Sequence, residues 1–284
     1  MSKSDFNGKT FPIIINGSNV VSSSYNNQFR YSPPVGSFTF PKGSKISIGE
    51  ISIYYSWFNF NNAYNNNSFS LIFPTYGTLQ INIGNQNLSI SQLNSYMQQQ
   101  MINAGLYLVN SSGQNVYYAE ILTAPSYYGI QVNLFQIPNS LPSGWSNPGA
   151  MPLSGYCPQF VVPNTNFQYV IGFAPATYGS ASSTTTESYL STFTPQVSPV
   201  QSILVGCSLL KNLANVNPTI LYTFSPAGVS YGNIIQTSPN YPQWIDIYDG
   251  VYPYIDIFFY DQNGNPLPLV DTNLVIQLLI YLPD

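Results

Sequence analysis

The sequence contains no histidine and few cysteines. Without histidine, Ser-His-Asp and Cys-His catalysis are unavailable, and the most common zinc and iron ligand is missing. Cys157 and Cys207 are too few for a disulfide framework and too far apart for a metal motif. Both lie among apolar residues, so we expect buried free thiols, although one bridge between them stays open. Glycine-rich nucleotide motifs are also absent. We therefore expect no catalytic residue, no metal site and no cofactor.

Charged residues are scarce as well: they make up 6% of the 284 residues, against about 25% in an ordinary globular protein. No apolar run reaches the roughly 18 residues of a membrane-spanning helix, and the N-terminus lacks the apolar core of a signal peptide. With 44% hydrophobic and 15% aromatic residues, the chain can still bury a core. Its surface must be largely uncharged, which suits a protein packed against neighbours. The alternative explanation for the excess of Asn and Tyr is the compositional bias of an AT-rich genome.

The few charges are unevenly placed along the chain. Five of the six basic residues lie in the first 45 positions: Lys3, Lys9, Arg30, Lys42 and Lys45. Six of the ten acids follow position 245: Asp246, Asp249, Asp256, Asp261, Asp271 and Asp284. This asymmetry can steer head-to-tail packing or seat an N-terminal arm on an acidic partner. The bases are too few for a nucleic-acid-binding face, so no sequence-specific nucleic acid is expected as a partner.

Most of the chain has the composition and alternation of β-strands. The predicted strands are 11–16, 37–40, 44–58, 69–73, 116–122, 128–137, 167–173, 202–210, 219–225, 243–249, 254–261 and 274–282. Within 44–58 the apolar residues change face near Gly49 and Glu50, which predicts a bulge. One segment predicts a helix: Leu93 and Met97 recur at helical spacing. Ser89 or Ser91 can cap its start, and Gly105 can end it.

About ten strands, one short helix and two long loops (138–158 and 174–199) predict an all-β fold, a single jelly-roll two-sheet antiparallel sandwich. We expect an N-terminal arm at 1–10 and a jelly-roll domain at 11–284. An insertion within 110–200 is an open alternative to long loops there.

Carboxylates are the remaining route to catalysis, as in glycoside hydrolysis. The candidates are Glu50, Glu120, Glu187 and the C-terminal aspartates Asp246, Asp249, Asp256 and Asp261. The spacing of these carboxylates does not indicate a catalytic site, and positions at strand edges and in turns account for their presence. The segment 261–265 fails the calcium-loop pattern. It predicts a hairpin in which Asn263 and Gly264 both take positive φ.

Aromatic residues near the expected loops could form a sugar platform, a protein interface or part of the core. They are Tyr127, Tyr128, Trp145, Tyr178, Tyr231, Tyr241 and Trp244. Core packing is the default expectation for each one taken alone. Their number indicates that some of them are exposed.

Three stretches of the sequence resemble a known family. They are FPKGSKISIGEISIYYSWFNF with NNSFSLIFPTYGTLQINI, LSISQLNSYMQQQMINAGLYLV with GQNVYYAEI, and the ending YIDIFFYDQNGNPLPLVDTNLVIQLLIYLPD. They are similar to the penton (minor capsid) proteins of virophages and Polinton-like viruses. The resemblance implies a non-enzymatic jelly-roll subunit that forms homopentamers at the fivefold vertices of an icosahedral virion. It also implies a double jelly-roll major capsid protein as a partner, and assembly inside the infected host cell.

Two other functions stay open from the sequence. A viral fibre or receptor-binding head would share the Ser, Asn and Tyr richness, but it would be trimeric. A carbohydrate-binding module or glycosidase would bind glycans through a loop aromatic.

Overall fold

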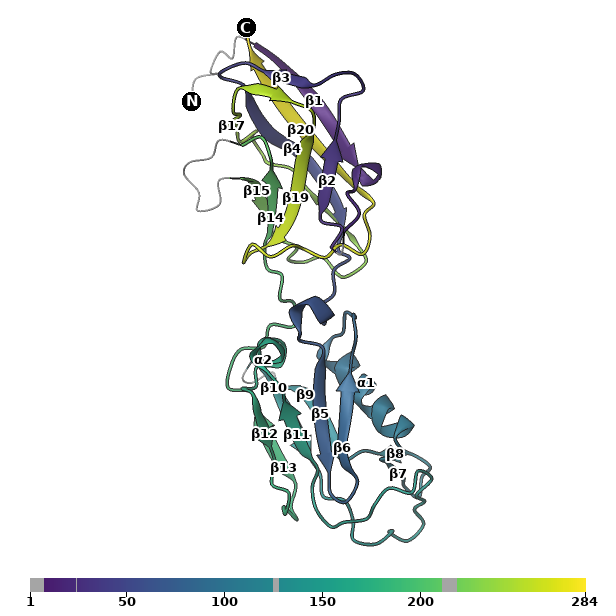
Figure 1. Cartoon of the computed structure of the whole chain (residues 1–284). Coiled ribbons are helices and arrows are strands. Elements are labelled where there is room, and N and C mark those ends of the chain that lie inside the picture. Colours follow the sequence, from purple (N-terminus) through teal and green to yellow (C-terminus); the bar gives the residue numbers. More distant parts are fainter. Residues whose placement is uncertain (1–7, 24, 125–127, 211–218) are drawn as a thin grey trace. The chain divides into compact units, whose positions relative to one another are not determined.

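The computed structural model describes residues 8–23, 25–124, 128–210 and 219–284. The chain divides into two compact units, which are described separately (Figure 1). Unit 1 combines Met1–Trp57 with Val200–Asp284, and unit 2 is Phe58–Pro199. Each unit buries its own hydrophobic cluster, and the two clusters share no residue.

Unit 1 is a sandwich of two antiparallel sheets. Its strands are β1 (Gly8–Asn16), β2 (Gln28–Tyr31), β3 (Phe38–Phe40), β4 (Lys45–Tyr54), β14 (Ile203–Cys207), β15 (Ile220–Phe224), β16 (Ile234–Thr237), β17 (Ile245–Asp246), β18 (Gly250–Tyr252), β19 (Ile255–Asp261) and β20 (Leu274–Pro283), with a 3-10 turn η1 (Gly17–Asn19). One sheet has the order β1-β20-β4-β16, with β17 also on β4, and is called sheet A below. The other, sheet B, has the order β15-β14-β19-β2. Strands β3 and β18 pair with each other.

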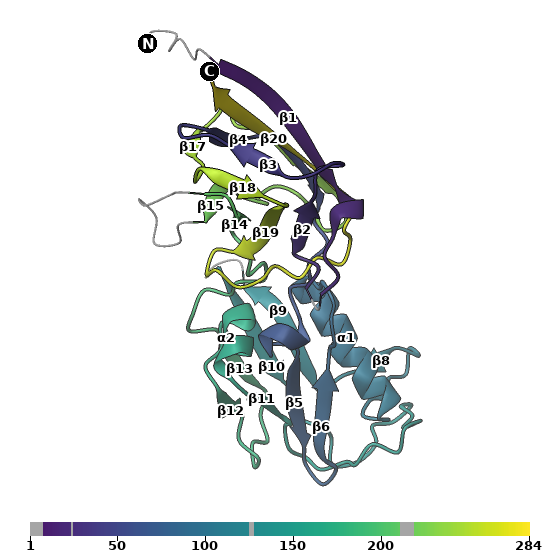
Figure 2. The same cartoon turned by 45° about the horizontal axis from the view of Figure 1, so that its top comes forward.

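The strand pairing in unit 1 is that of a jelly roll. Along the chain, the main sandwich strands are β1, β2, β4, β14, β15, β16, β19 and β20. The first pairs with the last (β1 with β20), the second with the seventh (β2 with β19), the third with the sixth (β4 with β16) and the two middle strands with each other (β14 with β15). These nested pairs form one long hairpin that folds over on itself, so that its strands make two four-stranded sheets. This arrangement defines a jelly roll. The predicted fold class is thereby confirmed (Figures 1 and 2).

The predicted change of face in β4 is confirmed as a bulge. The pairing of β4 with β20 shifts between Gln277 and Leu278, so Gly49 is the extra residue between Ile48 and Glu50. Ile48 lies in the core before the bulge and Ile51 after it. A bulge moves the side-chain alternation by one residue, and this lets one strand keep its isoleucines inside the sandwich along its whole length.

Strand β1 forms one edge of sheet A and carries Pro12. The N–H of Asn16 donates to Asn19 Oδ1 (2.9 Å) rather than to β20. Pro12 is four residues before Asn16, so its missing N–H belongs to the same outward row of the strand. Proline therefore sits where it costs no bond to β20 and removes one donor from the open edge, which discourages strand addition there.

Unit 2 packs two further antiparallel sheets around its own core. Its elements are η2 (Asn62–Tyr64), β5 (Ser68–Phe73), β6 (Gly77–Asn82), α1 (Ile90–Asn103), β7 (Leu108–Val109), β8 (Asn115–Val116), β9 (Ala119–Ala124), β10 (Gly129–Leu134), β11 (Gln159–Val162), α2 (Thr165–Ile171), β12 (Ala176–Tyr178) and β13 (Glu187–Leu190). The sheet orders are β12-β11-β5-β6 and β13-β10-β9, with a short β7–β8 pair besides. Residues of both sheets and of α1 meet in the buried cluster.

The predicted helix is confirmed as α1. Ser89 caps its start in a reciprocal capping box with Gln92, and Gly105 follows its end at a φ of 71°. The side chain of Asn94, on α1, accepts a hydrogen bond from the N–H of Ile121 (2.9 Å). The helix thus satisfies a backbone donor of strand β9 as well as covering the core.

The predicted strand at 167–173 is wrong, because most of this segment belongs to α2. Asn164 caps that helix by accepting from the N–H of Phe167 (2.9 Å), and Gly172 ends it at a φ of 75°. Phe167, Val170 and Ile171 are buried on one face. The composition of this short apolar run, with aromatic and β-branched residues, predicts a strand. The capping residues on either side of it indicate a helix instead. The expected single helix is therefore joined by a second.

The domain boundaries also differ from the expectation. Unit 2 begins at Phe58, well before the range 110–200 that was considered for an insertion, and it lies between β4 and β14. The strand at 69–73 alternates like those of the sandwich, so periodicity alone assigns it to the same sheet pair. Of the expected arm at 1–10, positions 1–7 lie outside the described residues, and positions 8–10 belong to β1.

Candidate functional site

Six of the seven candidate carboxylates have a hydrogen-bond or ion-pair partner, and Asp249 is exposed in the loop after β17. Glu50 accepts from Gln236, Glu120 from Asn133, Glu187 from the N–H of Ser180, and Asp246 pairs with Lys45. Within the described ranges, no group of three His, Cys, Asp or Glu residues could hold a metal ion. The contacts of these carboxylates are those of strand and turn residues.

Asp256 and Arg30 form a bidentate ion pair across β19 and β2. Arg30 Nε and the terminal guanidinium nitrogen each lie 2.8 Å from a different Asp256 oxygen. The guanidinium also lies 3.8 Å from the centre of the Tyr254 ring. Asp256 is buried, and its backbone N–H donates a hydrogen bond to Ser208 Oγ (3.0 Å). This arrangement links the edge strand β2 of sheet B to β19, and both Asp256 oxygens are used in the ion pair.

Asp261 organises the turn that follows β19. One carboxylate oxygen accepts from the N–H groups of Asn263 (2.8 Å) and Asn265 (2.9 Å), and the other accepts from the Asn265 amide (3.0 Å). Gly264 takes a φ of 80°, but Asn263 does not take a positive φ, so the predicted turn type is wrong. The N–H of Gly264 bonds to Asp261 O, and the N–H of Asp261 bonds to Asn265 O, which defines a three-residue hairpin loop.

The loop aromatics divide between core and surface. Tyr178 packs on Phe173, Trp145 lies against the unit 2 core and Trp244 packs on Tyr281. Tyr128 and Tyr241 are 87% and 83% exposed, and Tyr231 is partly exposed beside Tyr55. Tyr127 lies outside the described residues. Of these exposed aromatics, Tyr128 belongs to unit 2, whereas Tyr231 and Tyr241 belong to unit 1.

Both cysteines are free and buried, as predicted. Cys207 lies in β14, where burial raises the pKa of its thiol to about 12. Cys157 Sγ lies 3.2 Å from Thr185 O, and burial raises its pKa as well. Thiols that stay protonated at neutral pH are poor nucleophiles, so their place in the structure is that of small core residues.

The outer face of sheet A carries exposed aliphatic side chains that the sequence analysis did not single out. Ile14 on β1, Val275 on β20 and Ile234 on β16 are 56%, 48% and 50% exposed. A detectable signal existed for Ile14: in three successive isoleucines of one strand, the middle one must face away from the other two. Aliphatic residues on three strands of one open face are typical of a protein contact surface.

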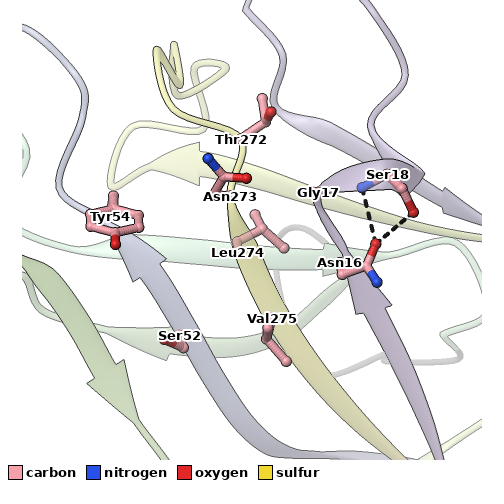
Figure 3. Close-up of a pocket in the computed structure, with 9 residues that line it drawn as sticks. All are labelled: Asn16, Gly17, Ser18, Ser52, Tyr54, Thr272, Asn273, Leu274 and Val275. Carbon is pink, nitrogen blue, oxygen red and sulfur yellow. Dashed lines mark hydrogen bonds between the residues drawn. The ribbon is translucent and has the colours of Figure 1, made fainter.

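A pocket opens on the same face, beside the end of β1 and the start of β20 (Figure 3). It has a volume of about 430 Å³ and is lined by Asn16, Gly17, Ser18, Ser52, Tyr54, Thr272, Asn273, Leu274 and Val275. Asn16 Oδ1 accepts from the N–H (3.0 Å) and the hydroxyl (2.6 Å) of Ser18, which fixes one wall. None of the lining residues is charged. The pocket can therefore hold a neutral group and offers no acid–base chemistry.

The described parts of the chain include no helix of the length and apolarity needed to cross a membrane.

The fold and its surfaces define a jelly-roll protein with a second unit inserted between its third and fourth strands. No family model matches the sequence, and no curated protein matches it. Among solved structures, the chain is similar to the penton protein of mavirus, with a TM-score of 0.47 and 10% identity over 96% of this chain and 98% of that one. It is also similar to a chain of the Sputnik virophage solved by cryo-EM, with a TM-score of 0.40 and 11% identity over 96% and 97% of the two chains.

Proposed function

We propose that the chain is a structural capsid protein, a penton-type subunit that forms homopentamers at the fivefold vertices of an icosahedral virus particle. The observation that carries the proposal is the nested strand pairing of unit 1. Jelly rolls of this kind serve in viral capsids, lectins and cupins. In this role the protein acts within the virion, is assembled inside the infected host cell and performs no catalysis.

Two features favour the capsid role over the other jelly-roll functions. Cupin chemistry depends on metal-binding side chains, and this sequence has no histidine. An uncharged surface with aliphatic residues on the open face of sheet A supports repeated contacts with like subunits.

The finer parts of the proposal concern the partners. Five copies would pack head to tail, each contact joining two different surfaces, because only such contacts close into a ring of five. The second partner would be a double jelly-roll major capsid protein surrounding the vertex. The sparsely charged surface of unit 2 suits contacts whose strength depends little on salt.

Native mass spectrometry of the purified protein tests the proposal. A particle with five times the mass of the 31.4-kDa chain is the expected result. Three copies would instead favour a fibre or receptor-binding head. A protein that stays monomeric at high concentration, and that antibodies fail to find in purified virions, contradicts the capsid role.

A further inference from the structure

The pocket on the outer face of sheet A is built from three neighbouring strands (Figure 3). One row of paired residues crosses its lining: Asn16 on β1, Val275 on β20 and Ser52 on β4. Tyr54 follows two residues after Ser52 and therefore lies on the same face of the sheet. Beside the pocket, Ile234 on β16 pairs with Tyr54 and is half exposed. The pocket thus combines an aromatic ring with aliphatic surface.

The lining also carries hydrogen-bonding groups that nothing in the described part of the chain uses. The hydroxyls of Ser52, Tyr54 and Thr272 and the side-chain amide of Asn273 have no hydrogen-bond partner there. Because polar groups that lose water must find new partners, an occupant has to bring hydrogen-bonding capacity as well as apolar surface. The volume of about 430 Å³ lies within the range of about 300–1,000 Å³ that is typical of small-molecule sites. An aromatic ring with one hydroxyl therefore fits.

A tyrosine with this chemistry protrudes from the same unit. Tyr241 lies in the connection 238–244 between β16 and β17 and is 83% exposed. A proline follows it directly and another precedes it by two positions, which restricts its backbone to extended conformations. Trp244 packs on Tyr281, with ring centres 6.1 Å apart, and this fastens the end of the connection to sheet A. Tyr241 is therefore presented to a partner with little further loss of conformational entropy.

Other protruding side chains match the pocket less well. In the described part of the chain, only Val35 and Tyr128 are as exposed as Tyr241 among the large apolar residues. Val35 has no group that could bond to the hydroxyls of the lining. Tyr128 is followed by a glycine, which leaves the backbone beside it less restricted than a proline does. Tyr241 itself is absent from the lining of the pocket in its own chain, so a second copy has to bring the two together.

We propose that copies of this chain associate head to tail, with Tyr241 of one copy inserted into the sheet A pocket of the next. Its ring packs against Tyr54 and Val275, and its hydroxyl bonds to Thr272 and Asn273. This inference rests on the proposed function, and it names the contact between neighbouring subunits. Tyr241 and the pocket are different surfaces of one unit, so each contact leaves a tyrosine free on one copy and a pocket free on the other. Such a contact repeats and can close into a ring.

Single substitutions test the two sides of the contact. Tyr241→Ala removes the protruding ring, and Ser52→Phe fills the pocket with a ring of its own. Removing an aromatic anchor from an interface weakens the contact by about 30-fold or more, and filling its pocket should weaken it at least as much. The matched controls are Tyr128→Ala, at an equally exposed tyrosine of unit 2, and Thr39→Phe, at an exposed strand position of unit 1. We expect both controls to assemble like the wild type in sedimentation velocity.

Mixing the two contact variants gives a sharper result. Tyr241→Ala keeps its pocket and Ser52→Phe keeps its tyrosine, so one copy of each can form a single contact. The resulting pair has no further tyrosine or pocket with which to grow. Native mass spectrometry of the mixture should show mixed pairs in clear excess over pairs of one variant, under conditions in which the wild type forms larger closed assemblies.

Circular dichroism confirms that each variant is folded. Should Ser52→Phe fail to fold, Tyr54→Ala takes its place in the mixture, because it removes the ring against which Tyr241 packs.

The outcomes separate this inference from the proposed function. If the wild type assembles and Tyr241→Ala or the pocket variant assembles equally well, the contact is overturned while the capsid role stands. A mixture without an excess of mixed pairs overturns it too, as do controls that lose assembly as much as the contact variants. A wild type that never assembles overturns both.

Discussion

The two separate hydrophobic cores predict that the chain unfolds in two steps. Phe69 belongs to the core of unit 2 and Phe259 to that of unit 1, and both side chains are fully buried. We expect Phe69→Ala to lower one thermal transition and Phe259→Ala to lower the other. Each variant serves as the control for its partner, because both remove the same side chain.

The expected size follows from what each ring contacts. Replacing a buried Phe by Ala costs about 3–5 kcal/mol, and an aromatic pair adds about 0.5–1.5 kcal/mol beyond burial. The Phe69 ring centre lies 5.4 Å from that of Phe160 and 5.3 Å from that of Phe167, whereas Phe259 has Phe29 at 5.9 Å. The loss should therefore be near the upper end of that range for Phe69→Ala and about 1 kcal/mol smaller for Phe259→Ala.

Differential scanning calorimetry measures both effects. For a unit of this size, 1 kcal/mol shifts the midpoint by roughly 2–5 °C, so each variant should move its own transition by about 10–20 °C. The other transition should stay within about 2 °C. A single cooperative transition, shifted equally by both substitutions, would refute the reasoning that each cluster stabilises its own unit.

The remaining predictions concern unit 1 and buried titratable groups. Asp261→Ala removes the acceptor of three N–H bonds and should lower the free energy of unfolding by about 2–4 kcal/mol in urea titrations. Asp261→Asn keeps one acceptor oxygen and should lose less; equal losses would contradict the role of that oxygen as an acceptor. Gly264→Ala should cost about 1–2 kcal/mol because of its positive φ, and Gly264→Asn less; an unchanged midpoint would contradict this. Burial raises the pKa of Cys207 and of Tyr118 to about 12, from ordinary values of 9.0 and 10.0. Their stabilisation is complete below the unfolded values and is lost as pH rises towards 12, so denaturation midpoints should fall above pH 9 in the wild type and less steeply in Cys207→Ala; identical pH profiles would contradict it.

The sandwich was predictable because its strands keep a strict pattern. In β4, Ile46 and Ile48 before Gly49 and Ile51 and Ile53 after it mark both the buried face and the bulge. The start of α1 was predicted as Ser89 or Ser91, and the structure selects Ser89, whose capping-box partner Gln92 lies three residues later. Such features depend on residues close in sequence, so they survive without knowledge of the tertiary fold.

Features that depend on distant residues were not predictable in the same way. Strand pairing over more than two hundred residues, as between Gly8 and Pro283, leaves no local mark that says which sheet a strand joins. The start of unit 2 at Phe58 was missed for that reason. The exposure of Val275 was missed for a similar reason. Alternation along β20 places Val275 on the face opposite to the buried Leu274 and Ile276, but it does not tell whether that face is covered.

The distribution of charge between the units bears on why the chain has so few charges. A genome-wide bias towards AT-rich codons would act on both units alike, and the two units are of similar length. Yet residues 58–199 contain only two charged residues, Glu120 and Glu187, while all 6 basic residues and the other acids lie in the segments of unit 1. Composition bias alone does not explain such a division. Electrostatic steering is then confined to unit 1, and the salt dependence of any assembly should follow substitutions there, whereas contacts made by unit 2 should be nearly independent of ionic strength.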